Sequence, residues 1–134
     1  MWKERNIDLW SLNHLLFGCT LAVFMKSFGF DFFTAVGLAV AIFLVWEVIE
    51  LSNRIFETKI NKISDVALEL LGFIVFYKIE FSQKVYIVLF LAFGLLEFFG
   101  FYSRIKEGQK NLLNYICIFL AVAYSFSGIF ILLL

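Results

Sequence analysis

The sequence lacks the features that mark many soluble enzymes and nucleic-acid-binding proteins. Its 134 residues carry 11 basic and 11 acidic side chains, and this balance gives no indication of nucleic-acid binding. It has one histidine, and it contains no P-loop and no HExxH, Glu-x-x-His or Ser-His-Asp arrangement. These absences exclude the usual sequence patterns of P-loop nucleotide hydrolysis, zinc proteases, di-iron helical bundles and serine-type hydrolysis.

Cysteine is almost as scarce as histidine. Cys19 and Cys117 are the only two, and both lie inside apolar stretches, 98 residues apart. A disulfide between them is not expected, and their spacing gives no metal-binding motif. We therefore predict that both are buried free thiols.

Apolar side chains, in contrast, are abundant. Hydrophobic residues make up 63% of the chain and aromatic residues 20%, and the mean hydropathy is +0.94. A soluble domain is only about 45–50% apolar. This excess predicts an all-α, polytopic membrane protein with a single transmembrane helical domain over residues 1–134. The first apolar run lacks a small-residue cleavage site followed by a polar mature chain, so we expect an uncleaved anchor.

Five apolar runs are separated by charged residues, and each is a candidate transmembrane helix. They cover residues 7–25, 32–51, 64–79, 85–102 and 112–134. Crossing a bilayer takes roughly 20 residues. The third run is shorter than that and contains Glu69, so it could be a re-entrant segment or a thin span instead. Because the loops are short, consecutive helices are expected to be antiparallel neighbours.

The basic residues indicate an orientation in the membrane. With five spans, one side of the membrane receives eight Lys and Arg residues, and the other side receives three. The positive-inside rule then places the N-terminus in the cytoplasm. We expect the chain to lie in the cell (inner) membrane. The eight are Lys3, Arg5, Arg54, Lys59, Lys62, Arg104, Lys106 and Lys110, and the three are Lys26, Lys78 and Lys84. Trp2, Trp10 and Trp46 fall near the cytoplasmic boundary, as expected for an aromatic belt.

Polar residues fall at a similar depth in all five runs, on the predicted cytoplasmic side. Counting about 1.5 Å per residue from that boundary, this layer comprises His14, Glu47, Glu50, Asp65, Glu69, Glu97 and Asn114. Glu47 and Glu50 are three residues apart, and Asp65 and Glu69 are four apart, so each pair lies on one face of its helix. A carboxylate that faces hydrocarbon is costly and usually marks a functional site. We therefore predict that these residues converge.

Simpler interpretations of the same residues stay open. Charges near helix ends can snorkel to the lipid headgroups, which would account for Glu50 and Asp65. Asp65 could also lie in the first turn of its helix with Ser64 as the N-cap, where the helix dipole favours a carboxylate. A lone His14 is more often a structural hydrogen-bond donor than a ligand.

The composition of the layer decides what chemistry it could support. Neighbouring carboxylates repel, so they need a proton, a basic side chain or a metal ion between them. Oxygen ligands suit Mg²⁺ or Mn²⁺, and a histidine would also permit Zn²⁺. The candidate catalytic residues, which are also the candidate ligands of a divalent cation, are His14, Glu47, Glu50, Asp65 and Glu69. Nearby, Arg54 and Lys62 could hold a lipid phosphate at the inner leaflet.

Short motifs within residues 10–75 resemble those of the VanZ-like family. In SDVALELLG, the residues Asp65, Glu69 and Gly72 are similar to an Asp, Asn and Gly at the same spacing in that family, with Glu69 in place of the Asn. The acidic pair in WEVIE resembles the segment upstream of that Asp. NHLLFG, which contains His14, resembles the early histidine of VanZ-like and related YjdF-like membrane proteins. The resemblance implies a small multi-pass bacterial membrane protein linked to cell-envelope glycopeptide resistance. We therefore expect a VanZ-like envelope protein that binds or modifies a lipid phosphate or a related envelope amphiphile.

Two other functions stay open. Glu50, Asn53 and Glu57 are similar in spacing to a motif of bacterial diacylglycerol kinase, which implies a lipid kinase that binds a magnesium nucleotide. The other possible function is that of a non-enzymatic membrane scaffold, in which the carboxylates and His14 only fix helix packing. In each case the expected partner is membrane lipid, with homo-oligomer formation left open and no nucleic acid.

Overall fold

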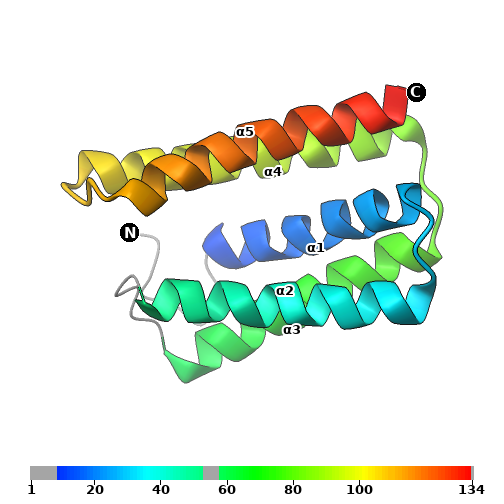
Figure 1. Ribbon diagram of the computed structural model, residues 1–134, viewed down its shortest axis with the longest axis horizontal. Helices are drawn as coiled ribbons and strands as arrows, with labels where there is room; N and C mark the ends of the chain where they lie inside the picture. Colours follow the sequence, from blue (N-terminus) through cyan, green and yellow to red (C-terminus); the bar gives the residue numbers. More distant parts are fainter. Residues whose placement is uncertain (1–8, 53–57, 134) are drawn as a thin grey trace. The chain divides into compact units, whose positions relative to one another are not determined.

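The computed structural model, which describes residues 9–52 and 58–133, confirms the all-α prediction. These residues form five α-helices and no strand: α1 (Leu9–Ser27), α2 (Phe32–Ser52), α3 (Lys59–Lys78), α4 (Gln83–Lys106) and α5 (Leu112–Leu133) (Figure 1). Four of them, α1, α2, α4 and α5, are long and apolar enough to cross a membrane. The chain is therefore a polytopic membrane protein.

Helix α3 is longer than the sequence pattern predicted. It begins at Lys59 instead of residue 64, and it has 20 residues. Its N-cap is Thr58, whose Oγ1 accepts a hydrogen bond from the backbone N–H of Asn61 at 3.1 Å. The interpretation of Ser64 as the cap is therefore wrong. α3 is long enough to cross a membrane, but it contains too many charged residues to be counted with the four apolar helices.

Helix α2 begins at an acidic N-cap. The Oδ1 atom of Asp31 accepts hydrogen bonds from the backbone N–H groups of Phe33 at 3.0 Å and Thr34 at 3.1 Å. The backbone carbonyl of Asp31 accepts the first hydrogen bond of the helix, from the backbone N–H of Ala35, at 2.9 Å. Hydrogen bonds from the side chain and backbone of Thr34, together with the one from Phe33, hold the pKa of the exposed Asp31 carboxyl below its usual value.

The chain divides into two compact units, Met1–Glu80 and Phe81–Leu134. In the first unit, α1 packs mainly against α3, and these two helices run parallel, while α2 runs in the opposite direction (Figure 1). Consecutive helices are thus antiparallel, as predicted, but α2 is not the main neighbour of α1. The apolar core of this unit consists of Leu21, Ala22, Met25, Ala35, Ala39, Phe43 and Phe73.

Two glycines allow the close approach of α1 and α3. A Cβ atom placed on Gly18 would lie 2.0 Å from the backbone oxygen of Glu69. A Cβ atom on Gly72 would lie 2.4 Å from the backbone oxygen of Leu15. Each helix therefore presents a glycine to the backbone of the other, and any larger residue would force the two helices apart.

The second unit is an antiparallel pair of helices, α4 and α5 (Figure 1). Small residues again bring the helices together, since Gly94 lies against the side chain of Ser125 and Gly128 lies against the ring of Phe90. Cys117 is buried in this unit and Cys19 in the first, and both are free thiols, as predicted.

Large apolar side chains are exposed along several helices. Phe33 and Val48 on α2 and Phe119 and Phe126 on α5 are all more than 60% exposed. An apolar surface of this kind is what a helix presents to lipid tails. Several polar and charged side chains, among them His14, Glu50, Asp65 and Glu69, are in contrast buried between helices.

Candidate functional site

The first unit brings together five of the seven residues that the sequence predicted to converge. His14 comes from α1, Glu47 and Glu50 come from α2, and Asp65 and Glu69 come from α3. Four of them are buried, with exposed fractions of 4% for His14, 1% for Glu50 and 0% for both Asp65 and Glu69. The Glu47 side chain is 13% exposed. These five residues are called the polar cluster below.

Burial rules out the snorkelling interpretation for two of these carboxylates. Glu50 and Asp65 lie inside the packed helices, so their side chains do not extend along the surface toward headgroups. Asp65 also lies well within α3 and not at its N-terminus, because the helix begins at Lys59. Enclosed carboxylates need hydrogen bonds or a bound cation to offset the loss of water.

His14 lies between the two carboxylates of α3. Its Nδ1 atom is 2.6 Å from Oε1 of Glu69, which is a short hydrogen bond. Its Nε2 atom is 3.8 Å from Oδ2 of Asp65, which is beyond hydrogen-bond distance. Nε2 makes no hydrogen bond to any residue in the described part of the chain. The four-residue spacing of Asp65 and Glu69 directs both side chains at the one imidazole.

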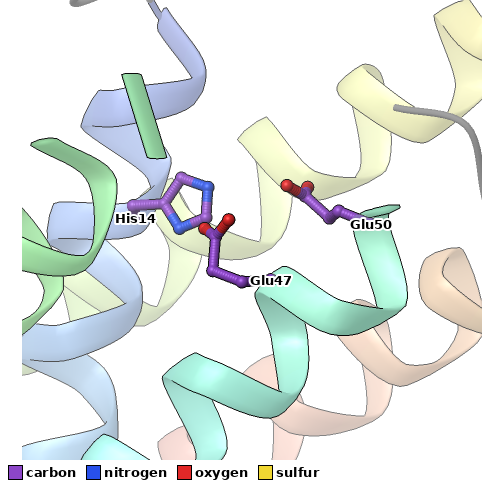
Figure 2. Close-up of side chains that lie close together, drawn as sticks. All are labelled: His14, Glu47 and Glu50. Atoms are coloured by element: carbon purple, nitrogen blue, oxygen red, sulfur yellow. The ribbon is translucent and has the colours of Figure 1, made fainter. Parts of the chain in front are cut away.

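The two glutamates of α2 also lie close to this imidazole. Figure 2 shows the Glu47 carboxylate beside the His14 ring, with Glu50 one turn further along the helix and directed into the same space. One ring nitrogen of His14 and one carboxylate oxygen from each glutamate all lie within 4.8 Å of one another. Divalent cations bind such atoms at about 2.0–2.6 Å, so a single ion could contact all three after a small adjustment.

Neighbouring residues support the carboxylates. The Trp10 indole donates from Nε1 to Oε1 of Glu50 at 3.1 Å. The Asn61 amide donates from Nδ2 to Oδ2 of Asp65 at 2.9 Å. These bonds hold an oxygen of each acid in a fixed direction, which is how residues outside a site keep the groups inside it oriented.

Sequence reasoning did not assign Trp10 and Asn61 to the site. Trp10 was interpreted as part of an aromatic belt, but it is only 5% exposed and its indole bonds to Glu50. Asn61 was overlooked because α3 was predicted to begin after it. A signal was present in both cases, because Trp10 lies four residues before His14 and Asn61 lies four residues before Asp65.

Of the two basic residues predicted to hold a lipid phosphate, Lys62 lies within the described part of the chain and Arg54 does not. Nζ of Lys62 lies 3.6 Å from Oε2 of Glu47, so this lysine borders the polar cluster. An ammonium has three donors, so this pairing leaves capacity for a second acceptor. Arg54 lies outside the described residues, as do Asn53 and Glu57 of the kinase-like motif.

Glu97 and Asn114, the remaining members of the predicted polar layer, belong to the second unit. Asn114 is fully buried, and its Nδ2 donates to the backbone oxygen of Gln109 at 2.6 Å. Its backbone N–H donates to Oδ1 of Asn111 at 3.0 Å. Asn114 therefore secures the turn that leads into α5.

Comparisons of the chain with protein-family models, curated proteins and solved structures find no match. The resemblances to VanZ-like proteins and to diacylglycerol kinase thus stay predictions.

Proposed function

We propose that this protein binds a divalent cation in its polar cluster and uses the cation to hold the phosphate, or a similar anionic group, of a membrane lipid or related envelope amphiphile. The observation that carries the proposal is the convergence of His14, Glu47 and Glu50, whose ligand atoms lie within 4.8 Å of one another. A buried imidazole and two carboxylates are ligand types that Mn²⁺ and Zn²⁺ accept, and the carboxylates also suit Mg²⁺.

The number of ligands supports a role beyond structure. Three protein ligands leave at least one position open on a four- to six-coordinate cation, and open positions are typical of sites where the metal contacts a substrate. The phosphate oxygens of a lipid would fill such positions. The cation would also polarise the phosphorus–oxygen bonds, which is the chemistry needed to modify the headgroup.

The setting of the site supports a lipid as ligand. The polar cluster lies among helices of which α1 and α2 are apolar enough to cross a membrane. Lys62 borders the cluster and can donate to an anionic headgroup. With the N-terminus in the cytoplasm, as the positive-inside rule predicts, the cluster would face the inner leaflet of the cell membrane.

A non-enzymatic scaffold is the second candidate, and one set of contacts favours it. The bonds from Trp10 to Glu50 and from Asn61 to Asp65 are those expected of a polar network that fixes helix packing without any ligand. This candidate predicts the same burial but no gain in stability from metal ions.

Melting temperature in mild detergent separates the two candidates. Binding to the folded state alone should raise stability by about 2.7 kcal/mol at a metal concentration 100 times the Kd. We expect such an increase with Mn²⁺ or Zn²⁺ against chelator, and its loss in the double variant Glu47→Gln/Glu50→Gln. The matched control is Glu80→Gln, because Glu80 is an 84% exposed carboxylate outside the polar cluster.

Two results would decide against the cation. These are a wild-type melting temperature that does not respond to any divalent metal, and an equal response in the double variant. The lipid part is tested by adding phosphatidic acid in detergent and measuring its retention by native mass spectrometry. We expect the protein to retain phosphatidic acid only when metal is present. If the protein binds metal but does not retain the lipid, the cation site binds another ligand. Transfer of phosphate from a nucleotide to lipid would select the kinase alternative.

A further inference from the structure

The contact between Glu69 and His14 carries information about which metal the site would take. Glu69 is fully buried, and its Oε1 lies 2.6 Å from Nδ1 of His14. An ionised carboxylate only accepts hydrogen bonds, so when Glu69 is ionised, Nδ1 carries the hydrogen of this bond. In the neutral imidazole, the other nitrogen, Nε2, then has a free lone pair.

The environment of Nε2 is that of a nitrogen prepared for a ligand. His14 is 4% exposed, and Nε2 makes no hydrogen bond within residues 9–52 and 58–133, although Oδ2 of Asp65 lies 3.8 Å from it. Buried polar nitrogens nearly always have a partner, because leaving one without a partner costs free energy. A metal ion bound to Nε2 would supply that partner.

We infer that Glu69 is a positioning residue that orients His14 as a nitrogen ligand and thereby selects a first-row transition metal, such as Mn²⁺ or Zn²⁺, over Mg²⁺. This inference rests on the cation site of the proposed function and adds the identity of the metal. A carboxylate behind a metal-bound histidine fixes the ring and its tautomer, and it raises the basicity of the ligand.

The selectivity follows from the ligand types. Imidazole nitrogen suits transition metals, whereas Mg²⁺ prefers oxygen ligands in a regular octahedron and dehydrates reluctantly. The set of His14, Glu47 and Glu50 offers one nitrogen and two carboxylates. Mg²⁺ would not need the imidazole as a ligand, and it would not need the carboxylate that orients the imidazole.

The packing keeps Glu69 in place. Its own backbone oxygen lies against Gly18, one turn beyond His14 on α1, and Gly72 lies one turn beyond it on α3. The His14–Glu69 bond thus lies one turn from two glycines at which α1 and α3 approach closely. A ligand that is held on rigid helices keeps its geometry better than one on a loop.

The experiment measures the affinities of Mn²⁺, Zn²⁺ and Mg²⁺ for the full chain in detergent, together with the pulsed EPR spectrum of bound Mn²⁺. We expect at least about 10-fold tighter binding of the transition metals than of Mg²⁺, and a nitrogen coupling from His14 in the spectrum. In Glu69→Gln, Mn²⁺ and Zn²⁺ affinity should fall about 10- to 100-fold, while Mg²⁺ affinity changes little. Glu80→Gln is the control.

Each outcome has a separate meaning. If Mg²⁺ binds as tightly as Mn²⁺, or if bound Mn²⁺ shows no nitrogen coupling, the inference is overturned while the cation site stands. The second result would indicate a doubly protonated imidazole held between Glu69 and Asp65. If no metal binds, the proposed function falls as well. If Glu69→Gln does not fold, the wild-type affinity ratio and spectrum still decide the question.

Discussion

Replacing Gly18 by alanine tests the close approach of α1 and α3. The added Cβ atom would lie 2.0 Å from the backbone oxygen of Glu69, whereas ordinary contacts of this kind begin at 3.4 Å. The helices must therefore separate by about 1.4 Å, the difference between these distances, because a backbone oxygen cannot rotate away as a side chain can. Overpacking of this kind costs about 1–3 kcal/mol and occasionally more.

Gly37→Ala is the matched control. Gly37 also lies within a helix, α2, but a Cβ atom there would meet nothing within 4 Å. Alanine should therefore stabilise α2 by up to about 1 kcal/mol through its higher helix propensity. We expect Gly18→Ala to be less stable than wild type, and Gly37→Ala to be equal to it or more stable.

The assay is equilibrium unfolding in mild detergent, followed by tryptophan fluorescence. The site adds a second readout, because a separation of about 1.4 Å at Gly18 would stretch the 2.6 Å bond between His14 and Glu69, one turn away, past hydrogen-bond distance. Metal affinity should fall together with stability in Gly18→Ala. Equal stabilities for Gly18→Ala and Gly37→Ala would show that the two helices do not pack as closely as described.

Three further outcomes are expected. Trp10→Phe removes the indole N–H that Glu50 accepts and should lower the free energy of unfolding by about 1–3 kcal/mol; unchanged stability would contradict a structural role for that bond. The pKa of the Asp31 carboxyl is lower in the folded than in the unfolded protein. The ionised Asp31 carboxylate therefore stabilises the fold above the unfolded pKa of about 3.9, and this stabilisation is lost as the pH falls through the folded pKa. Asparagine keeps a capping oxygen, so below about pH 5 the melting temperature of Asp31→Asn should fall less steeply with decreasing pH than that of wild type. Equal pH dependence of the two melting temperatures would contradict this role of the Asp31 carboxylate. Reporter fusions at the two ends of the chain should report from opposite sides of the membrane if all five helices cross it, and reports from one side would mean that α3 does not cross.

The helices could be predicted from the sequence because charged residues separate the five apolar runs. The largest differences are at the start of α3, which begins at Lys59 instead of residue 64, and at the end of α4, which continues to Lys106 instead of ending at residue 102. The first turn of α3 contains Lys59 and Lys62, so the apolar pattern begins later than the hydrogen bonding that Thr58 initiates. An N-cap threonine followed by a polar turn is a weak signal beside a long apolar run.

The polar cluster was predictable in its membership but not in its contacts. The spacings of Glu47 with Glu50 and of Asp65 with Glu69 identify two helix faces, and the structure turns both faces toward His14. The pairing of α1 with α3 could not be read from spacing, because it depends on where Gly18 and Gly72 meet the backbone of the other helix. Complementarity between distant segments has no local pattern in the sequence.

The parallel pairing of α1 with α3 also sets a condition on how the protein is made. His14 and Glu69 are 55 residues apart, and a ribosome adding about 5–20 residues per second needs about 3–11 s to cover that distance. During this interval α1, the least apolar of the four membrane-spanning candidates, carries its polar face without the helix that will cover it. The two side chains of the His14–Glu69 bond therefore meet only after α3 has been made.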